Sequence, residues 1–235
     1  MAKLGNNAQN EQEGKETVEF FKDLDREALN TERFLEKYSK QIGIVFGVLI
    51  LGVLGFFGYK QFVEAPKNVE AVKSYLSAQK NAVDGKDKEA LGGKSAANPG
   101  FLGTYEDYSG TKVGKLSAYN AGLLKFKEGK FQEAYDLLDK FSSDNKTLMA
   151  MKYGAMADAK SSLNKNDEAL TLLDKAASAS DDPYTNYYFT RKAGIVALGL
   201  KKNAEAKKYF ATIDEKYQDY DNGMSDSYIE MTKYY

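Results

Sequence analysis

The chain contains no cysteine, no histidine and no tryptophan among its 235 residues. Without cysteine it has neither disulfides nor thiolate metal sites. Histidine is the usual general base near neutral pH and the commonest transition-metal ligand, so its absence excludes Ser-His-Asp and Cys-His triads and histidine-bearing zinc sites. Glycine-rich phosphate loops and the nucleophile-elbow motif are also missing. We therefore predict that the protein is not an enzyme and holds no cofactor or metal.

A carboxylate-dependent enzyme is the catalytic alternative that these absences leave open. Two pairs of adjacent acids could be considered. Asp181 and Asp182 precede a proline and belong to a turn, whereas Glu106 and Asp107 lie in a short aromatic segment near the surface. Neither spacing predicts a buried acid pair, so this alternative ranks below a binding protein.

Charge of one sign is also scarce, because the net charge is only −1. Residues 1–41 hold seven basic and nine acidic residues, which gives −2, and residues 60–235 hold 26 and 25, which gives +1. Neither part has the basic excess that neutralises phosphates on nucleic acid. Nucleic acid is therefore not expected as a partner.

One long uncharged run, residues 42–59 (IGIVFGVLILGVLGFFGY), stands out against this polar background. Its 18 residues approach the roughly 20 that an α-helix needs to cross the hydrocarbon core. A cleaved signal peptide is the competing interpretation, but the 41-residue leader is longer than such leaders normally are. We expect an uncleaved transmembrane helix, and therefore a membrane protein.

The basic residues around this run predict its orientation, since the cytoplasmic side carries the excess of lysine and arginine. Five lie just before the run and three just after it: Lys22, Arg26, Arg33, Lys37 and Lys40 against Lys60, Lys67 and Lys73. This bias places residues 1–41 in the cytoplasm and residues 60–235 across the membrane. The reversed, cytoplasm-facing topology remains the alternative.

The N-terminal tail and the apolar run have further features. Residues 1–14 are polar and expected to be disordered, and the pattern turns helical from Lys15. Within the run, four glycines share one helical face: Gly43, Gly47, Gly55 and Gly58. Small residues on one face allow close helix–helix contact in a membrane, although glycine is also simply frequent in such helices.

The three prolines divide the remaining chain, because proline favours helix boundaries. Pro66 is expected to separate the membrane helix from a helical unit at 67–91, in which Gly85 ends the first helix and 87–91 form a further turn. A loop at 92–114 follows. Within that loop, residues 101–108 carry bulky side chains at helical spacing, and we expect them to dock on the core.

From Lys115 onward the sequence repeats with a period near 35 residues. We predict repeats at about 115–148, 150–183 and 187–220, and a cap helix at 225–235. Each repeat has a small residue, a second small residue and a large apolar one at matching positions: Gly122, Ala134 and Leu138; Ala157, Ala169 and Leu173; Gly194, Ala206 and Phe210. Two helices of a hairpin can approach closely only where side chains are small, so the predicted fold is an all-α stack of hairpins.

This pattern resembles the tetratricopeptide repeat, most specifically in the turn Gly-Lys-Phe-Gln-Glu-Ala at 129–134. The second and third copies have Asn164 and Lys201 where glycine is usual. The layout of tail, single span and C-terminal repeat domain is similar to the YfgM-type membrane protein family, in a Bacteroidetes-type form. That resemblance implies an ancillary subunit of the Sec translocon in the bacterial inner membrane, facing the periplasm and partnered with the membrane-anchored chaperone PpiD.

The first helices of stacked hairpins line a concave face, where a partner or a translocating client would bind. The exposed positions predicted there are Tyr119, Leu123, Phe126, Met151, Asp158, Tyr188, Arg191 and Ile195. Tyrosine and arginine anchor protein interfaces well. The competing interpretation, which we favour, is that these side chains form core covered by the N-terminal helix or the cap. Packing is likewise the preferred interpretation for the aromatic cluster Tyr184, Tyr187, Tyr188 and Phe189. The function we expect is that of a scaffold or adaptor acting through protein–protein binding.

Overall fold

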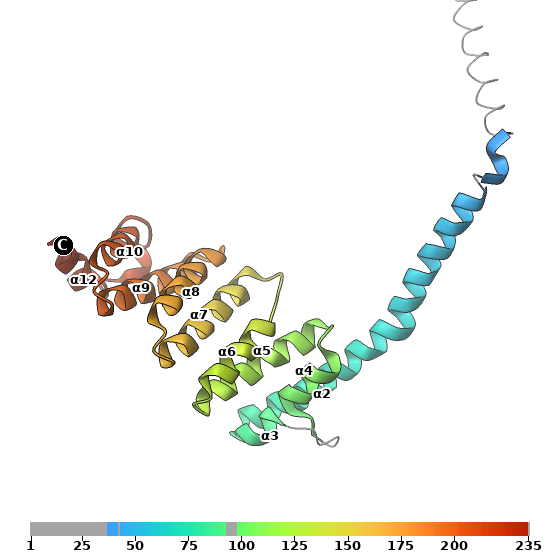
Figure 1. Ribbon diagram of the computed structural model, residues 1–235, viewed down its shortest axis with the longest axis horizontal. Helices are drawn as coiled ribbons and strands as arrows, with labels where there is room; N and C mark the ends of the chain where they lie inside the picture. The colour runs from blue at the N-terminus through green and yellow to red at the C-terminus, as the bar shows by residue number, and fades with distance from the viewer. Residues whose placement is uncertain (1–36, 42, 93–97, 235) are drawn as a thin grey trace, which may run out of the picture. The chain divides into compact units, whose positions relative to one another are not determined.

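The computed structural model describes residues 37–41, 43–92 and 98–234. The expectations for the tail before residue 37 and for Ile42 lie outside the described residues. The chain divides into two compact units, Met1–Glu64 and Ala65–Tyr235. The described residues of both units form helices joined by turns and short links, and they contain no strand (Figure 1). The expected all-α class is therefore confirmed.

The first unit contains the apolar run as a helix at 43–59, followed by a π-helical turn, η1 (Lys60–Glu64). Its large apolar side chains are exposed: Leu51 is 70% exposed and Val53 is 53% exposed. The run belongs to a helix, Lys37–Val83, that is long and apolar enough to cross a membrane, and its apolar window is 0% buried. A core helix of a soluble protein would be mostly buried instead.

Pro66 does not separate two helices as expected. It lies in the first turn of α2 (Ala65–Val83), which follows η1 directly. A proline is tolerated in the first turn of a helix, where its missing N–H would have no intrahelical partner. The helical backbone is therefore continuous in sequence through the position that was predicted to interrupt it.

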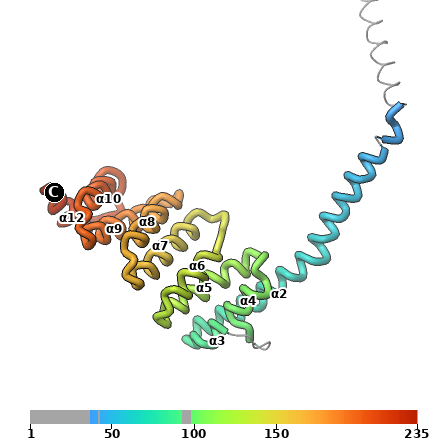
Figure 2. The backbone as a smooth tube through the Cα atoms, viewed as in Figure 1, coloured from blue at the N-terminus to red at the C-terminus, as the bar shows by residue number. Residues whose placement is uncertain are grey.

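The second unit consists of helix pairs joined by tight turns (Figure 2). The helices of these pairs are α2 with α3 (Asp87–Leu91), α5 (Lys112–Lys127) with α6 (Phe131–Lys140), α7 (Lys146–Ser162) with α8 (Asn166–Ala179), and α9 (Pro183–Gly199) with α10 (Asn203–Lys216). Partners within each pair and neighbours between pairs are in contact. The last three pairs begin three or four residues before the expected repeats, because their N-cap residues precede the apolar periodicity.

Segment 92–114 is not only a loop. It contains α4 (Gly100–Tyr108), which packs on α2 and α5, and α5 already begins within it. Phe101 is 2% exposed and its ring lies 5.5 Å from that of Tyr75. The aromatic segment therefore docks on the core as its helical spacing predicted.

Small residues bring the two helices of each of the last three pairs together, as the repeat pattern predicted. A methyl group added at Gly122 would lie 2.8 Å from Leu138 Cγ, and one at Gly194 would lie 2.9 Å from Phe210 Cζ. Both large side chains are 0% exposed. The second small residues are equally enclosed: Ala134, Ala169 and Ala206 are 0%, 1% and 0% exposed.

All four pairs share one turn, including the first pair. The residue two positions after the end of the first helix is left-handed in each case: Gly85 (φ 72°), Gly129 (φ 77°), Asn164 (φ 59°) and Lys201 (φ 59°). The next residue is always a lysine, whose N–H donates back to the carbonyl five residues earlier at 2.8–2.9 Å. This is the hydrogen bond of a Schellman helix end. The matching sequences are GKDKEA, GKFQEA, NKNDEA and KKNAEA at 85–90, 129–134, 164–169 and 201–206.

Polar side chains define the links between pairs. Asn145 and Asp182 cap α7 and α9 by accepting hydrogen bonds from backbone N–H groups in the first turn. Lys112 pairs with Asp144 at 2.9 Å, with side chains 91% and 90% exposed, and Lys146 pairs with Asp181 at 2.9 Å, with side chains 63% and 79% exposed. These ion pairs lie at the surface, outside the apolar seams.

Candidate functional site

The eight residues predicted for the concave face lie on three helices: Tyr119, Leu123 and Phe126 on α5, Met151 and Asp158 on α7, and Tyr188, Arg191 and Ile195 on α9. Their exposure is uneven. Leu123, Met151, Tyr188 and Ile195 are exposed, at 39%, 45%, 49% and 36%. The other four are half-buried, so the expectation of eight exposed side chains holds for only half of them.

The α9 residues come together in one pocket of about 400 Å³. Positions 188, 191 and 195 share a helix face because they are three and four residues apart. The complete lining is Tyr184, Tyr187, Tyr188, Arg191, Lys192, Ile195 and Met224. The volume is near the lower end of the roughly 300–1,000 Å³ of small-ligand pockets, a size that suits a few side chains of a partner.

The aromatic cluster in the first half of α9 contains two buried residues and two that line the pocket. Tyr187 and Phe189 are packing residues, 2% and 6% exposed, as expected. Tyr184 and Tyr188 are 56% and 49% exposed and line the pocket, which the packing interpretation missed. The Phe189 ring occupies the space beside Gly154, where an added methyl group would lie 2.1 Å from Phe189 Cε1. Its burial holds the neighbouring Tyr188 at the surface.

The α5 residues are not part of this pocket. Tyr119 packs on Phe141, with ring centroids 5.1 Å apart, and burial raises the pKa of Tyr119. Phe126 packs on Phe131 across the turn of its own hairpin at 5.2 Å. These two residues are half-buried because aromatic neighbours cover them.

Leu123, Met151 and Asp158 have separate surroundings. Leu123 lines a different cavity of about 270 Å³ together with α2 and α4 residues. Met151 is exposed on α7 outside the α9 pocket. Asp158 forms an ion pair with Lys192 at 2.6 Å, which links α7 to the rim of the α9 pocket. The predicted face is therefore several local sites on the first helices, of which the α9 pocket collects the most predicted residues.

Arg191 is the distinctive polar group of the α9 pocket. Its Nη2 donates to the Met224 carbonyl at 3.2 Å, and the guanidinium lies 5.9 Å from the Tyr228 ring centroid. Its Nε is buried without a hydrogen-bond partner in the described part of the chain. Within the same part, no carboxylate lies within ion-pair distance of this side chain. The guanidinium is thus partly desolvated without a direct counter-ion.

A buried acid fixes the floor beside the α9 pocket. Asp221, 3% exposed, accepts hydrogen bonds from Tyr187 Oη at 2.9 Å, Ser225 Oγ at 2.6 Å and the Ser225 backbone N–H at 2.8 Å. Burial would raise the pKa of Asp221, but these hydrogen bonds, with the Arg191 charge, lower it below its ordinary value. Burial, and then the hydrogen bond to Asp221, raises the pKa of Tyr187 to about 12.

This network ties the C-terminal helices to α9. Asp221 ends α11 (Gln218–Asp221), and Ser225 precedes α12 (Asp226–Thr232), which packs on α10. Met224, 53% exposed, thereby reaches the pocket lining. Sequence reasoning missed Asp221, Met224 and Ser225. The only sequence signal is that a serine lies four residues after an acid between two short helical stretches.

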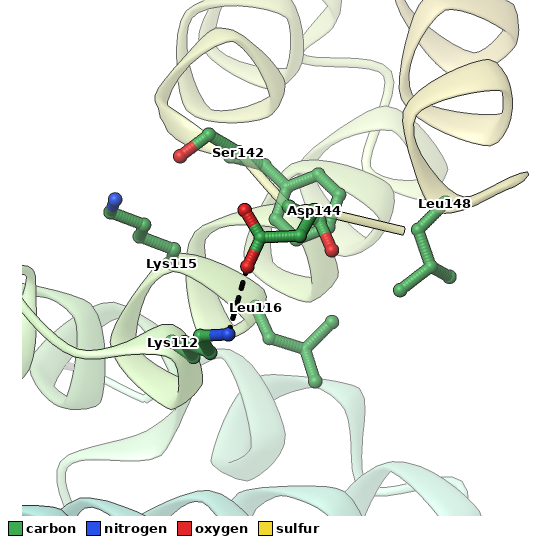
Figure 3. A pocket seen from close by; sticks show the side chains of 8 residues that line it. Lys112, Lys115, Leu116, Ser142, Asp144 and Leu148 are labelled. Atoms are coloured by element: carbon green, nitrogen blue, oxygen red, sulfur yellow. Dashed lines mark hydrogen bonds and ion pairs between the residues drawn. The ribbon is translucent and has the colours of Figure 1, made fainter. Parts of the chain in front are cut away.

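A second pocket of about 310 Å³ lies where the link between α6 and α7 passes the start of α5. In Figure 3 the carboxylate of Asp144 points toward Lys112, and Leu116 and Leu148 lie to one side. The hydrogen bond that Lys112 donates to Asp144 raises the pKa of Lys112 and lowers that of Asp144. Because Lys112 and Asp144 pair with each other at the surface, neither charge is available to a ligand, and this pocket is the weaker candidate.

A buried lysine lies close to this second pocket. Lys152, 7% exposed, donates to the carbonyls of Asp139 at 3.0 Å and Phe141 at 2.8 Å, at the end of α6. Burial lowers the pKa of Lys152. Both carbonyls belong to a helix end that would otherwise leave them unpaired, so this lysine has a structural role.

Residues 37–41, 43–92 and 98–234 hold no group of three or more acidic side chains that could bind a metal ion. Comparison with protein-family models and with curated proteins finds no match for the chain.

Proposed function

We propose that this protein is a single-pass, membrane-anchored adaptor whose helix-pair domain binds other proteins. The observation that carries this proposal is the apolar helix at 43–59, whose large apolar side chains are exposed in the described part of the chain. Such a surface is stable in lipid and not in water, because each fully exposed large apolar side chain forgoes about 1.5–3 kcal/mol of burial. The domain that follows in the chain offers an aromatic and cationic pocket suited to contact with proteins.

The helix pairs are proposed to be tetratricopeptide repeats. Three lines of support are the four matching turns, the spacing of Ala134, Ala169 and Ala206 by 35 and 37 residues, and the close approach at Gly122 and Gly194. The first pair, with its five-residue second helix, is then a degenerate unit, and α12 is the cap on the last pair. Repeat stacks of this kind act by presenting extended surfaces, which fits an adaptor.

The location proposed is the bacterial inner membrane, with the tail at 1–41 in the cytoplasm and the repeat domain in the periplasm. Support comes from the five-to-three bias of basic residues and from the resemblance in layout to the YfgM-type family. The partners proposed on that resemblance are Sec translocon subunits and a membrane-anchored periplasmic chaperone. Translocating clients would then meet the first helices of the repeats.

Two experiments test anchoring and topology. Alkaline carbonate should leave the full chain in the membrane pellet, and release into the supernatant would remove the anchor. Alkaline phosphatase fused after residue 235 should be active, while green fluorescent protein at the same place should be dark if exported unfolded. The reverse pattern would turn the domain to the cytoplasm and end the periplasmic assignment.

Partner binding is tested by purifying the tagged full chain in mild detergent and identifying co-purified proteins by mass spectrometry. We expect translocon or chaperone subunits, and we expect Tyr188→Ser to reduce their recovery at least threefold, since a central aromatic anchor costs about 1 kcal/mol or more when removed. Tyr234→Ser is the matched control, because Tyr234 is 82% exposed and lies outside the α9 pocket. Recovery of neither class of partner would remove the translocon assignment.

A further inference from the structure

The lining of the α9 pocket has two chemical halves. Tyr184, Tyr188, Ile195 and Met224 expose apolar surface, at 56%, 49%, 36% and 53% of their side chains. Arg191 and Lys192 supply two cations, and no acidic residue lines the pocket. A ligand that fills this space therefore meets an apolar wall next to positive charge.

The two cations are not equivalent. Lys192 is already paired with Asp158 at 2.6 Å on the α7 side. Among the described residues, the Met224 carbonyl at 3.2 Å is the one hydrogen-bond acceptor of Arg191, and Asp221, the acid near it, is engaged by Tyr187 and Ser225. Arginine presents five N–H donors in a planar fork that fits a carboxylate with two parallel hydrogen bonds. The group that would complete this pocket is thus a carboxylate of a ligand that pairs with the Arg191 guanidinium.

We propose that the α9 pocket binds a segment of a partner protein in which an acidic side chain lies beside a large apolar one. The carboxylate bonds to Arg191, and the apolar side chain packs between the exposed tyrosines and Met224. This assignment rests on the proposed adaptor function and specifies the chemistry of the partner at one site. Selectivity for the acid comes from the partly desolvated guanidinium, because an uncharged isostere would leave its donors without a counter-ion.

A matched pair of peptides tests this proposal on the full chain in detergent micelles. The probe is acetyl-Ser-Glu-Trp-Leu-Ser-amide, and its partner has Gln in place of Glu. The chain contains no tryptophan, so the peptide's indole fluorescence anisotropy reports binding without background from protein tryptophan. We expect the Glu peptide to bind about fivefold or more tightly than the Gln peptide, as a charge-assisted pair at a half-buried site provides.

Substitutions at the guanidinium locate the preference. Arg191→Gln should bring the affinity ratio of the two peptides close to one, and Arg191→Lys should reduce it at least twofold, since lysine keeps the charge and loses the fork. Lys175→Gln, an exposed lysine on α8 outside the pocket, should leave the ratio unchanged. If Arg191→Gln does not fold, as judged by circular dichroism, Arg191→Lys decides the question.

The proposal is overturned if neither peptide binds, if both bind the unsubstituted chain equally, or if the preference survives in the Arg191 variants. Partner recovery from membranes separates this failure from failure of the adaptor function. Recovery that depends on Tyr188 but not on Arg191 keeps the adaptor and removes the acidic partner. Recovery that depends on neither residue removes the α9 pocket from both proposals.

Discussion

Replacing Asp221 with asparagine should weaken the attachment of the C-terminal helices to α9 and so destabilise the domain. The carboxylate is 3% exposed and accepts three hydrogen bonds, from Tyr187 Oη, Ser225 Oγ and the Ser225 N–H. Hydrogen bonds to a charged group contribute about 1.5–3 kcal/mol each, and asparagine keeps one acceptor oxygen while turning an N–H₂ group toward a donor. Losing one to two of these bonds predicts a destabilisation of about 2–4 kcal/mol.

Thermal unfolding of the full chain in mild detergent, followed by circular dichroism, measures this loss. At about 2–4 °C per kcal/mol for a domain of this size, the midpoint should fall by roughly 4–16 °C. Tyr187→Phe removes only one of the three bonds and should cost about 1.5–3 kcal/mol. Because Tyr187 and Asp221 share that bond, the double variant should lose less than the two single variants summed.

Acid provides a second readout of the same network. The folded-state pKa of Asp221 lies below its unfolded value of about 3.9, so its stabilising contribution is full at neutral pH and is lost as pH falls through the folded-state pKa. The asparagine variant should therefore lose less stability than the unsubstituted chain below about pH 4. A midpoint for the variant within about 1 °C of the unsubstituted chain at neutral pH would refute the reasoning, since it would mean that the three bonds contribute nothing.

Three further predictions address the seams, the turns and the membrane helix. Gly154→Ala should cost about 1–3 kcal/mol in unfolding measurements, because its methyl group would overlap the Phe189 ring, whereas Gly199→Ala, with open space around it, should be neutral or stabilising. Lys201→Gly should raise the melting midpoint by a few degrees, because lysine at φ 59° is strained by about 1 kcal/mol. Gly47→Leu should weaken partner co-purification, because a bulky side chain prevents close packing of membrane helices.

Each of these has a result that would contradict it. Equal stability of the Gly154 and Gly199 variants would mean that the α7–α9 seam is loosely packed. A lower midpoint for Lys201→Gly would mean that the lysine side chain contributes more than its backbone conformation costs. Unchanged partner recovery with Gly47→Leu would dismiss a functional contact on the glycine face.

The sequence predicted the seams of the fold well because their chemistry is local. Small residues such as Ala134 and Gly194 recur at a fixed sequence spacing from a large apolar one. In a hairpin this spacing places the large side chain against the small residue of the paired helix. The fourth turn, at Gly85, was also readable, since its six residues match the other three copies. It was predicted as the turn of a degenerate unit, because its second helix, α3, is only five residues long and lacks the large residue that completes the pattern.

The candidate site was predicted only where one helix face determines it. Tyr188, Arg191 and Ile195 meet because their spacing on α9 aligns them. The core interpretation of Tyr119 named the N-terminal helix or the cap as its cover. The residue that covers it, Phe141, follows the end of another helix, and periodicity along one helix does not reveal such a neighbour. Met224 lies in the turn between α11 and α12, which the buried Asp221 holds in place through its hydrogen bonds to Ser225. The position of this turn against α9 depends on tertiary contacts, so it has no local sequence signal.

The surface position of the ion pairs between hairpins has a consequence for the medium in which this domain can work. Lys112 with Asp144 and Lys146 with Asp181 are largely exposed, so dissolved ions screen them, and they add little to the cohesion of the stack. The packing of small residues against large apolar ones, such as Gly154 against Phe189, contributes cohesion that ionic strength hardly affects. In a compartment whose salt concentration varies with the cell's surroundings, such a domain would stay folded. The strength of its ionic contacts with partner proteins would change with the salt concentration.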